Sequence, residues 1–295
     1  MKPKDIASYI FLAIAWGLSF LVTLHVVRGF GWVGAVAFRA LIASATLFAI
    51  ARLSGRTLSF RIGWSRFAVL GLSTVTLQLI GLSYAIPRIG TAMSAICVAS
   101  IPLFSMVISQ LWGLERITLR GLTGLLLGFF GMIVLVGFPA QEITQSFILG
   151  CIAAIIACIA SAYGSNYASR NFKGIGSWEM TIGSFLLGGI LCLPLLIVVP
   201  VPGIPAPADF LYLFTAACLM SALTYLIYFR LVASIGPTKA VSVEFVVTVI
   251  AVLVGALYLH EPLSVLQLIG AAVIITGCSL VLSARPGVPP QTAAE

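Results

Sequence analysis

One stretch of the sequence occurs twice, and this internal repeat limits the architectures that the chain can adopt. Residues 235–281 align without a gap with residues 89–135, each position lying 146 further along the chain (235 − 89 = 146). In both copies an apolar segment is followed by a short turn with a glutamate and by a second apolar segment with glycines seven apart. Such self-similarity indicates a structural unit that is built twice. The identical pairs are Ile89/Ile235, Gly90/Gly236, Leu111/Leu257, Glu115/Glu261, Leu122/Leu268, Gly124/Gly270 and Gly131/Gly277.

The composition indicates that lipid rather than water surrounds most of the chain. Of the 295 residues, 61% are hydrophobic and 8% are charged, whereas a soluble domain has about 25% charged residues. The net charge of +8 comes from short loops between apolar runs. Because no basic stripe with interleaved aromatics occurs, nucleic acid is not an expected partner. The six cysteines lie in apolar runs without a CxxC pair, which indicates buried free thiols and no metal site.

Ten apolar runs are long enough to cross a bilayer, which takes about 20 residues for a hydrocarbon core of about 30 Å. The first run follows two lysines, as in a signal peptide, but it exceeds the usual ~7–15 residues and no small-residue cleavage site follows. We therefore expect a retained first span and an all-α polytopic membrane protein. The predicted spans are residues 6–27, 32–53, 66–86, 91–112, 119–138, 147–169, 178–199, 209–229, 238–259 and 264–283.

The positions of lysine and arginine predict the orientation. With the N-terminus in the cytoplasm, thirteen of the 16 basic residues fall in inner segments, while two, Arg28 and Arg88, fall in outer loops and Arg39 lies within a span. This bias predicts that both termini are cytoplasmic. Five spans per half is an odd number, so the second half must be inverted relative to the first. We predict ten transmembrane helices as two inverted five-helix repeats, in residues 1–140 and 141–285, with a disordered cytoplasmic tail in residues 286–295.

Several local motifs resemble a known transporter family. They are the Trp16-Gly17 pattern, Arg39, the group Tyr225, Tyr228 and Phe229, the Ile235-Gly236 turn, and the run from Leu259-His260-Glu261-Pro262-Leu263-Ser264 to Gly270 and Gly277. On these residues each half resembles an EamA-type module of the drug/metabolite transporter superfamily, over about residues 6–283. Two positions depart from the family's pattern. Thr248 stands where a mid-helix proline is common, although the first copy keeps Pro102, and Phe185 takes the place equivalent to Arg39.

The resemblance implies a ten-helix transporter of small metabolites in the bacterial inner (plasma) membrane, commonly an exporter of amino acids and related compounds. The direction of transport rests on this resemblance alone. Fold-level similarity does not supply the substrate.

Four charged residues within or beside the predicted spans are candidates for specific roles. Glu244 lies about 9 Å into span nine at ~1.5 Å per residue. An acid at that depth is a functional candidate, and we predict a coupling role, with a snorkelling or hydrogen-bonded carboxylate as the alternative. Arg39 is assigned a structural role at helix-end carbonyls, with binding of a substrate carboxylate as the alternative. Glu115 and Glu261 each precede a helix, where an acid favours the N-terminal dipole, and are assigned structural roles.

Polar and aromatic side chains at mid-depth form the predicted substrate site. Sites in inverted-repeat transporters lie near the midplane between the halves, and aromatic faces with a few hydrogen-bonding groups suit small amphipathic solutes. The alternative is interhelical hydrogen bonding by the polar groups, with aromatics facing lipid. We expect spans three, four, eight and nine to line the path. The predicted substrate-binding residues are Trp16, Gln78, Tyr163, Asn166, Thr224, Tyr225 and Tyr228.

The glycines of span five predict a helix contact. Gly121, Gly124, Gly128 and Gly131 share one helix face, which favours close packing within the monomer or between protomers. Both a monomer and a homodimer stay open.

The sequence lacks the motifs of the main enzyme classes considered. The two histidines, His25 and His260, are isolated near outer ends of spans, and no nucleophile elbow or GxxxxGK[ST] loop occurs. We predict a secondary transporter, not an enzyme, with no cofactor, that exports small amphipathic metabolites by alternating access. Aromatic or hydrophobic amino acids are favoured because the expected lining is aromatic and aliphatic. The alternatives are transport of nucleotide sugars, organic phosphates or drugs, and, in different classes, an intramembrane hydrolase or a passive scaffold. The expected partners are the small-molecule substrate and membrane lipid.

Overall fold

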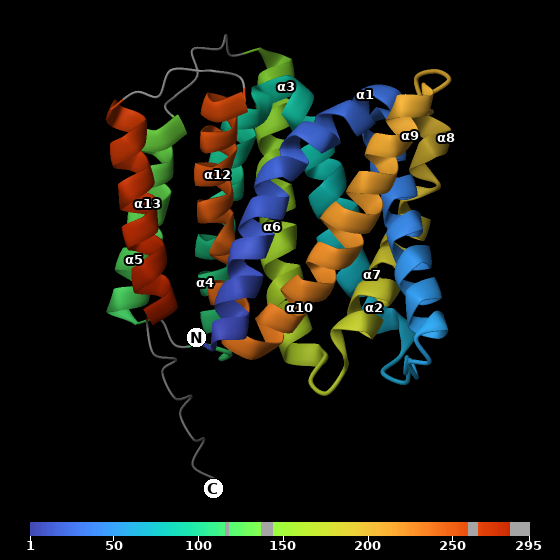
Figure 1. Cartoon of the computed structure of the whole chain (residues 1–295), viewed down its shortest axis with the longest axis horizontal. Helices are drawn as coiled ribbons and strands as arrows, with labels where there is room; N and C mark the ends of the chain where they lie inside the picture. The colour runs from blue at the N-terminus through green and yellow to red at the C-terminus, as the bar shows by residue number, and fades with distance from the viewer. Residues whose placement is uncertain (116–117, 137–143, 259–264, 284–295) are drawn as a thin grey trace, which may run out of the picture.

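The computed structural model describes residues 1–115, 118–136, 144–258 and 265–283 (Figure 1). These described residues form helices and turns and contain no strand. The elements in chain order are α1 (Pro3–Leu53), α2 (Trp64–Gly71), η1 (Leu72–Leu77), α3 (Gln78–Val98), α4 (Ile101–Leu111), α5 (Leu119–Val136), α6 (Gln145–Asn171), α7 (Ser177–Cys192), α8 (Leu195–Val198), α9 (Pro207–Phe214), η2 (Thr215–Leu223), α10 (Thr224–Ile235), α11 (Pro237–Val241), α12 (Val243–Tyr258) and α13 (Val265–Ser283).

Three glycines fold the chain back on itself without a loop. Gly31, Gly90 and Gly236 have φ values of 70°, 77° and 89° and ψ values of 166°, 165° and 162°, a region that is essentially restricted to glycine. In Figure 1, α1 rises from the N-terminus, bends at the upper edge and descends, so it contains the first two spans. In the same way α3 holds the end of span three and the start of span four.

The described residues cover all ten predicted spans apart from residues 137, 138, 259 and 264. The chain is an all-α polytopic membrane protein. Five of its described helical stretches are long and apolar enough to cross a membrane by length and composition, and shorter apolar helices provide others. The largest difference at a span end concerns span eight, expected to end at residue 229, which continues through α10 to Ile235. The extension is possible because the Arg230 side chain is exposed and can extend its charged end toward the membrane surface.

The two halves share local structure at repeat-related positions. The π-helical segments η1 and η2 overlap at the 146-residue offset, since residues 72–77 correspond to residues 218–223. The repeat-related residues Gln78 and Thr224 follow directly. A π-turn disturbs the regular carbonyl pairing of a helix, and nearby hydroxyls compensate. Thr74 Oγ1 donates to the Leu70 carbonyl and Thr224 Oγ1 to the Met220 carbonyl, both at 2.8 Å.

The repeat is inverted, as predicted. The turns at Gly90 and Gly236 have nearly the same backbone angles. The turn within α3 lies at the upper edge of Figure 1, whereas the α10–α11 turn lies at the lower edge. Equivalent turns therefore face opposite sides of the molecule.

The contact between α5 and α13 shows the same two-fold relation at single residues. It is the most extensive helix–helix contact in the described chain. A Cβ at Gly277 would lie 2.6 Å from the Gly124 carbonyl oxygen, and a Cβ at Gly131 would lie 3.0 Å from that of Gly270. Exchanging the repeat mates, Gly124 with Gly270 and Gly131 with Gly277, converts one contact into the other. The predicted packing role of Gly124 and Gly131 is confirmed, and the contact lies within one chain.

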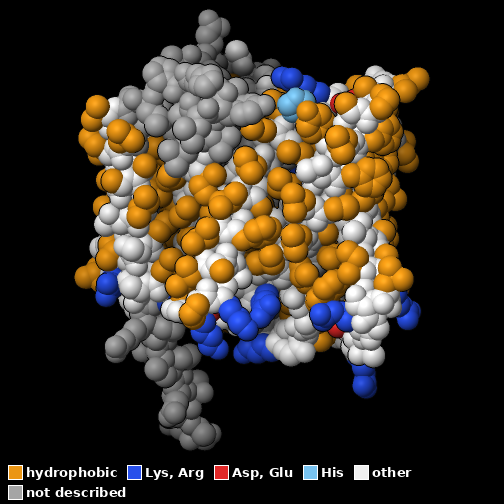
Figure 2. All heavy atoms as spheres, viewed as in Figure 1, with side chains coloured by type: hydrophobic (Ala, Val, Ile, Leu, Met, Phe, Trp, Pro, Cys, Tyr) orange, Lys and Arg blue, Asp and Glu red, His pale blue; other side chains and the backbone are white. Residues whose placement is uncertain are grey.

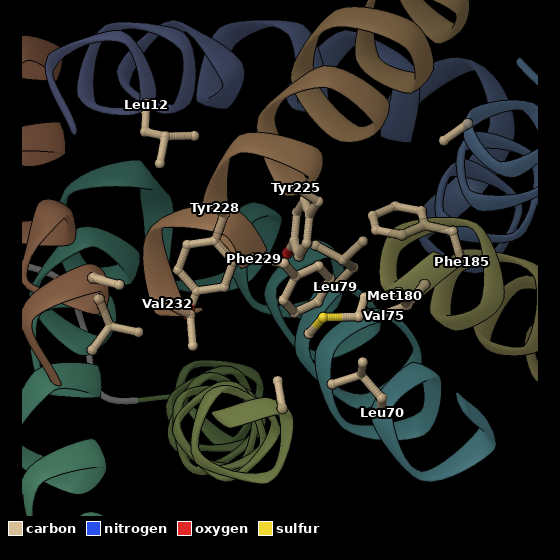
Figure 3. Close-up of a cluster of buried hydrophobic side chains, with 14 of the residues drawn as sticks. Leu12, Leu70, Val75, Leu79, Met180, Phe185, Tyr225, Tyr228, Phe229 and Val232 are labelled. Atoms are coloured by element: carbon tan, nitrogen blue, oxygen red, sulfur yellow. The ribbon is translucent and has the colours of Figure 1, made fainter. Parts of the chain in front are cut away.

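The largest buried cluster joins both halves. Figure 3 shows Tyr225, Tyr228 and Phe229 of α10 at its centre, with Leu79 of α3 and Phe185 of α7 beside them. Phe185 is the residue that takes the place equivalent to Arg39, and its ring packs edge-on against Tyr225 at a centroid distance of 4.8 Å. At this repeat-related position the second half therefore has an aromatic ring, whereas the first half has a cation.

The visible surface carries an apolar band between two polar edges. In Figure 2 hydrophobic side chains cover the middle of the molecule, and most lysines and arginines in view gather at the lower edge. At that lower edge α1 begins and α13 ends (Figure 1). The edge that carries both helix ends is the basic edge that the lysine and arginine count assigns to the cytoplasm.

Candidate functional site

A cavity of about 80 Å³ lies between the two repeats. Residues of spans one to four line it from one side, and residues of spans eight and nine line it from the other. The lining consists of Trp16, Ser19, Thr23 and Arg39 of α1, Gln78, Leu79, Leu82, Ser83, Ile86 and Val98 of α3, Ile101 of α4, Tyr225 of α10 and Glu244 of α12. The expectation that spans three, four, eight and nine line the path is incomplete, because α1 packs against both η2 and α12 and so adds spans one and two.

Arg39 is the cation of this cavity. Its side chain is buried, and it donates to the Ser221 hydroxyl, to the Met220 carbonyl at 3.1 Å and to the Thr23 hydroxyl at 3.4 Å. Ser221 and Met220 belong to η2, so the guanidinium fixes span two against the π-turn of span eight. A guanidinium has five N–H donors, and these three bonds leave two of them without a partner in the described residues. Arg39 therefore contacts one backbone carbonyl, as its predicted structural role requires. Two of its N–H groups stay available at the cavity wall.

Glu244 is the acidic residue of the same cavity. The residue is 9% exposed, and its carboxylate forms no hydrogen bond or ion pair with a described residue. A buried carboxylate without a protein partner is costly. Because Glu244 borders the cavity, water or a bound solute can supply the missing partner.

Aromatic rings form the wall between these two charges. The Trp16 ring lies 5.8 Å from the Tyr225 ring and 5.4 Å from the Tyr228 ring, both centroid distances, in tilted geometry. Tyr228 is itself held by a hydrogen bond with the Ser165 hydroxyl of α6. The wall thus combines rings from the first span and the eighth, one from each repeat.

The cavity is closed toward the basic edge. Tyr9 Oη of α1 is 3.0 Å from the Ser242 hydroxyl between α11 and α12, and the Ser234 hydroxyl donates to Asp5 at 3.1 Å. Along α1, Trp16 lies seven residues beyond Tyr9, which is about 10 Å at ~1.5 Å per residue. The cavity therefore lies beyond these contacts, toward the opposite edge.

Glu115 supports the same closed end. Its carboxylate occupies the space that a Cβ at Gly236 would need, at the start of α11. Burial raises the pKa of the Glu115 carboxyl, while nearby Thr238, Ser109 and Lys239 lower it in part. The Glu115 carboxyl thus lies at the beginning of span nine, whereas the sequence predicts a role at α5, the helix that follows it in the chain. Its repeat mate Glu261 lies outside the described residues, as does His260.

The structure separates the predicted site residues into two groups. Trp16, Gln78, Tyr225 and Glu244 line the cavity, and Tyr228 stands directly behind Trp16.

The other predicted residues lie elsewhere. Tyr163 is 36% exposed and packs against Trp112 and Tyr167 on the outside of the bundle. Asn166 Nδ2 donates to Ser105 Oγ at 2.9 Å and to the Ala162 carbonyl at 2.9 Å. Thr224 bonds to backbone carbonyls of η2. Asn166 thus matches the interhelical bonding weighed as the alternative, whereas Thr224 bonds within its own span.

Three polar residues of the cavity lining are not among the substrate-binding residues predicted from the sequence, namely Ser19, Thr23 and Ser83. Ser19 lies three residues after Trp16, and Thr23 lies four residues after Ser19. This spacing places all three on one helix face. That spacing is the signal by which they could be found. Among the described residues, no group of three or more His, Cys, Asp or Glu side chains is placed to hold a metal ion.

Comparison with known proteins agrees with this architecture. The model of the EamA-like transporter family matches residues 5–137 and 148–283, one match for each half. A solved structure superimposes with a TM-score of 0.79 at 18% identity, covering 95% of this chain and 98% of that chain. At this identity the superposition establishes the fold alone.

Relatives in bacteria are similar along nearly the whole length. The chain is 26% identical over 294 residues to the uncharacterized transporter YvbV of Bacillus subtilis, covering 95% of this chain and 92% of the relative. It is 25% identical over 288 residues to the protein PecM of Dickeya dadantii, with coverages of 95% and 92%. Since the family model covers both halves and the central cavity lies between them, the chain is a membrane transporter that belongs to the EamA-like transporter family.

Proposed function

We propose that this transporter exports small amphipathic metabolites, most of all aromatic or other hydrophobic amino acids, across the bacterial inner membrane, with both termini in the cytoplasm. The observation that carries the proposal is the central cavity, which one buried arginine and one buried glutamate line together with aromatic and aliphatic side chains. Substrate sites of inverted-repeat transporters lie in the same place, between the halves.

The charges of the cavity match those of a free amino acid. The two unpartnered N–H donors of Arg39 can bind a substrate carboxylate in the bidentate geometry that guanidinium groups favour. The unpartnered carboxylate of Glu244 can accept hydrogen bonds from a substrate ammonium group. Trp16 and Tyr225 then offer ring faces to an apolar side chain. A solute with only one of these three features leaves a buried group of the cavity unsatisfied.

The size of the cavity requires movement of the halves. Its volume of about 80 Å³ is well below the ~300–1,000 Å³ of typical ligand pockets. In this conformation the cavity has room for water molecules but not for an aromatic amino acid. The two repeats must separate for loading, as they do in alternating access.

Counterflow in reconstituted vesicles tests the proposal. Vesicles loaded with unlabelled phenylalanine should accumulate labelled phenylalanine, whereas labelled nucleosides, hexose phosphates and cationic drugs should not accumulate under their own loading. Accumulation only of an anionic phosphate ester or only of a cationic drug would contradict the amino-acid assignment. Arg39 is the one basic residue of the described lining, and a multiply charged anion needs more than one.

Two tyrosines provide a matched pair of variants. Tyr225→Leu removes a ring from the cavity and should lower phenylalanine counterflow by up to about tenfold, since a contact between two aromatic rings contributes ~0.5–1.5 kcal/mol. Tyr163→Leu removes a ring from the outside of the bundle and should leave counterflow within about twofold. Equal loss in the two variants would contradict the location of the site.

Glu244→Gln separates proton coupling from simple facilitated diffusion. The variant keeps the shape of the side chain and removes its titration. If Glu244 couples export to proton entry, the variant, whose amide oxygen still accepts a hydrogen bond from the substrate ammonium group, keeps measurable phenylalanine counterflow but no longer responds to an imposed pH gradient. Identical responses of the variant and the natural protein to the pH gradient would remove Glu244 from the coupling mechanism.

A further inference from the structure

A second cavity lies at the basic edge, outside the central site. Its volume is about 640 Å³, and it lies where α1 ends and the loop 54–63 leads to α2. We name it the Arg52–Arg56 groove. The side chains that define it here are Phe48, Arg52, Arg56, Thr57, Phe60 and Trp64. In Figure 1 the end of α1 lies at the same edge as the N-terminus, which is the edge with most of the visible lysines and arginines in Figure 2.

Both arginines of the groove are held by rings and lack an anionic partner. The Arg52 guanidinium lies 5.3 Å from the centre of the Phe48 ring, and the Arg56 guanidinium lies 4.8 Å from the centre of the Trp178 ring. Neither forms an ion pair with a described residue. A guanidinium stacked on a ring keeps its N–H edge available for an oxyanion. The nearby carboxylate of Glu179 accepts a hydrogen bond from the Ser59 amide at 3.4 Å and is not part of the lining.

The rest of the groove is aromatic and borders lipid. Phe60 and Trp64 stack with a centroid distance of 5.2 Å and an interplanar angle of 12°. Trp64 is 50% exposed, and Leu53 beside the groove is 89% exposed. Exposed tryptophan at the end of a span is typical of the depth at which lipid headgroups lie. A ligand bound here therefore meets two cations at its polar end and an apolar surface at its other end.

The two arginines are not part of the duplicated framework. At the 146-residue offset, Arg52 corresponds to Val198 and Arg56 to Pro202. The equivalent loop of the second half lies at the opposite edge, and Asp209 is the charged residue in its range 199–209. Only the basic edge carries the groove. Anionic phospholipids give the cytoplasmic leaflet its negative surface potential.

We propose that the Arg52–Arg56 groove binds the headgroup phosphate of an anionic phospholipid from the leaflet at the basic edge. The two guanidinium groups bind the phosphate oxygens, Thr57 supplies a neutral hydrogen-bonding group, and the stacked Phe60 and Trp64 contact the glycerol backbone and the first methylenes of the acyl chains. The site is independent of the transported solute.

Native mass spectrometry of the full-length protein tests this site. The protein in detergent is titrated with phosphatidylglycerol or phosphatidylcholine, and bound lipid is counted. We expect phosphatidylglycerol to be retained in preference to phosphatidylcholine. Arg52→Gln together with Arg56→Gln should weaken phosphatidylglycerol binding about tenfold or more, since the two substitutions remove the charge-assisted hydrogen bonds from both guanidinium groups to the phosphate oxygens.

The control removes the same charge elsewhere on the same edge. Arg61→Gln together with Arg230→Gln should keep phosphatidylglycerol binding within about twofold. Equal weakening in the two double variants would overturn the proposal, because it would indicate a diffuse surface charge effect.

A third arm distinguishes a lipid from a free phosphate ligand. Inorganic phosphate or glycerol 3-phosphate should fail to displace phosphatidylglycerol, because neither offers an apolar portion to Phe60 and Trp64. Displacement by either would overturn the lipid assignment. If the Arg52/Arg56 double variant does not elute as the natural protein does on size exclusion, Arg52→Gln and Arg56→Gln are each compared with Arg61→Gln under the same expectations.

Discussion

The contact of α5 with α13 gives a stability prediction whose sign is decided by the structure. A Cβ added at Gly277 would lie 2.6 Å from the Gly124 carbonyl oxygen and 2.6 Å from the Gly128 nitrogen. Both neighbours are backbone atoms, so the helices must separate to admit it. Overpacking of this kind costs about 1–3 kcal/mol. Helix propensity acts in the opposite direction, since alanine is favoured over glycine by up to about 1 kcal/mol. Gly277→Ala should therefore destabilise the protein, by about 1–2 kcal/mol.

Titration of the purified protein with sodium dodecyl sulfate, followed by tryptophan fluorescence, measures this change in the free energy of unfolding. Gly131→Ala, at the repeat-related contact, should cost a similar amount because its Cβ would lie 2.8 Å from the Ile274 nitrogen. Gly203→Ala is the matched control, since nothing lies within 4 Å of its Cβ, and it should change stability by less than about 0.5 kcal/mol. If Gly277→Ala proved as stable as the Gly203→Ala control, the close contact and the symmetry argument built on it would be refuted.

Two further predictions concern the closed end of the central cavity. Gly236→Ala places a side chain on a residue with φ of 89° and into the space of the Glu115 carboxylate. We expect the free energy of unfolding to fall by about 1–3 kcal/mol in the same detergent titration. An unchanged free energy of unfolding would contradict this expectation. Burial raises the pKa of Glu115 above its ordinary value, so the folded state binds the proton more tightly than the unfolded state. The stability that this proton contributes is fully present at acid pH, below the ordinary carboxyl pKa, and is lost as the pH rises through the raised pKa. Glu115→Gln removes this loss, so its melting temperature should rise relative to that of the natural protein as the pH is raised above the ordinary glutamate pKa of about 4. A difference that does not vary with pH would exclude the mechanism.

The architecture could be predicted from the sequence because two kinds of signal are strong in it. The repeat pairs Gly90/Gly236 and Gly124/Gly270 report a backbone conformation and a close approach that few other residues tolerate. The lengths of the apolar runs indicate which segments span the bilayer, and the positions of the basic residues indicate their orientation. These signals lie in single residues and in segment lengths, and they do not depend on which way a helix faces.

The rotation of each helix was much harder to predict. A span that is apolar on every side lacks the polar stripe that fixes orientation in a soluble helix. Tyr163 and Tyr225 look alike in sequence, yet one packs on the outside of the bundle and the other lines the cavity. Asn166 and Thr224 lie at mid-depth as expected, but their side chains donate hydrogen bonds to neighbouring hydroxyl and carbonyl groups. Ser19 and Thr23 line the cavity because α1 packs against both η2 and α12. Their spacing to Trp16 identifies them only once Trp16 is known to face the cavity.

The central claim is that a solute passes between the two repeats when they move apart, and a reversible cross-link tests it most directly. The Ser234 hydroxyl and the Asp5 carboxylate lie 3.1 Å apart and join the second repeat to the first at the basic edge. In a background with the six native cysteines replaced by alanine, Asp5→Cys together with Ser234→Cys can be bridged by a short thiol-specific cross-linker that dithiothreitol cleaves. We predict that cross-linked protein in vesicles loses phenylalanine counterflow and recovers it on reduction, while either single variant is unaffected. Undiminished counterflow in the fully cross-linked protein would contradict transport by separation of the two halves.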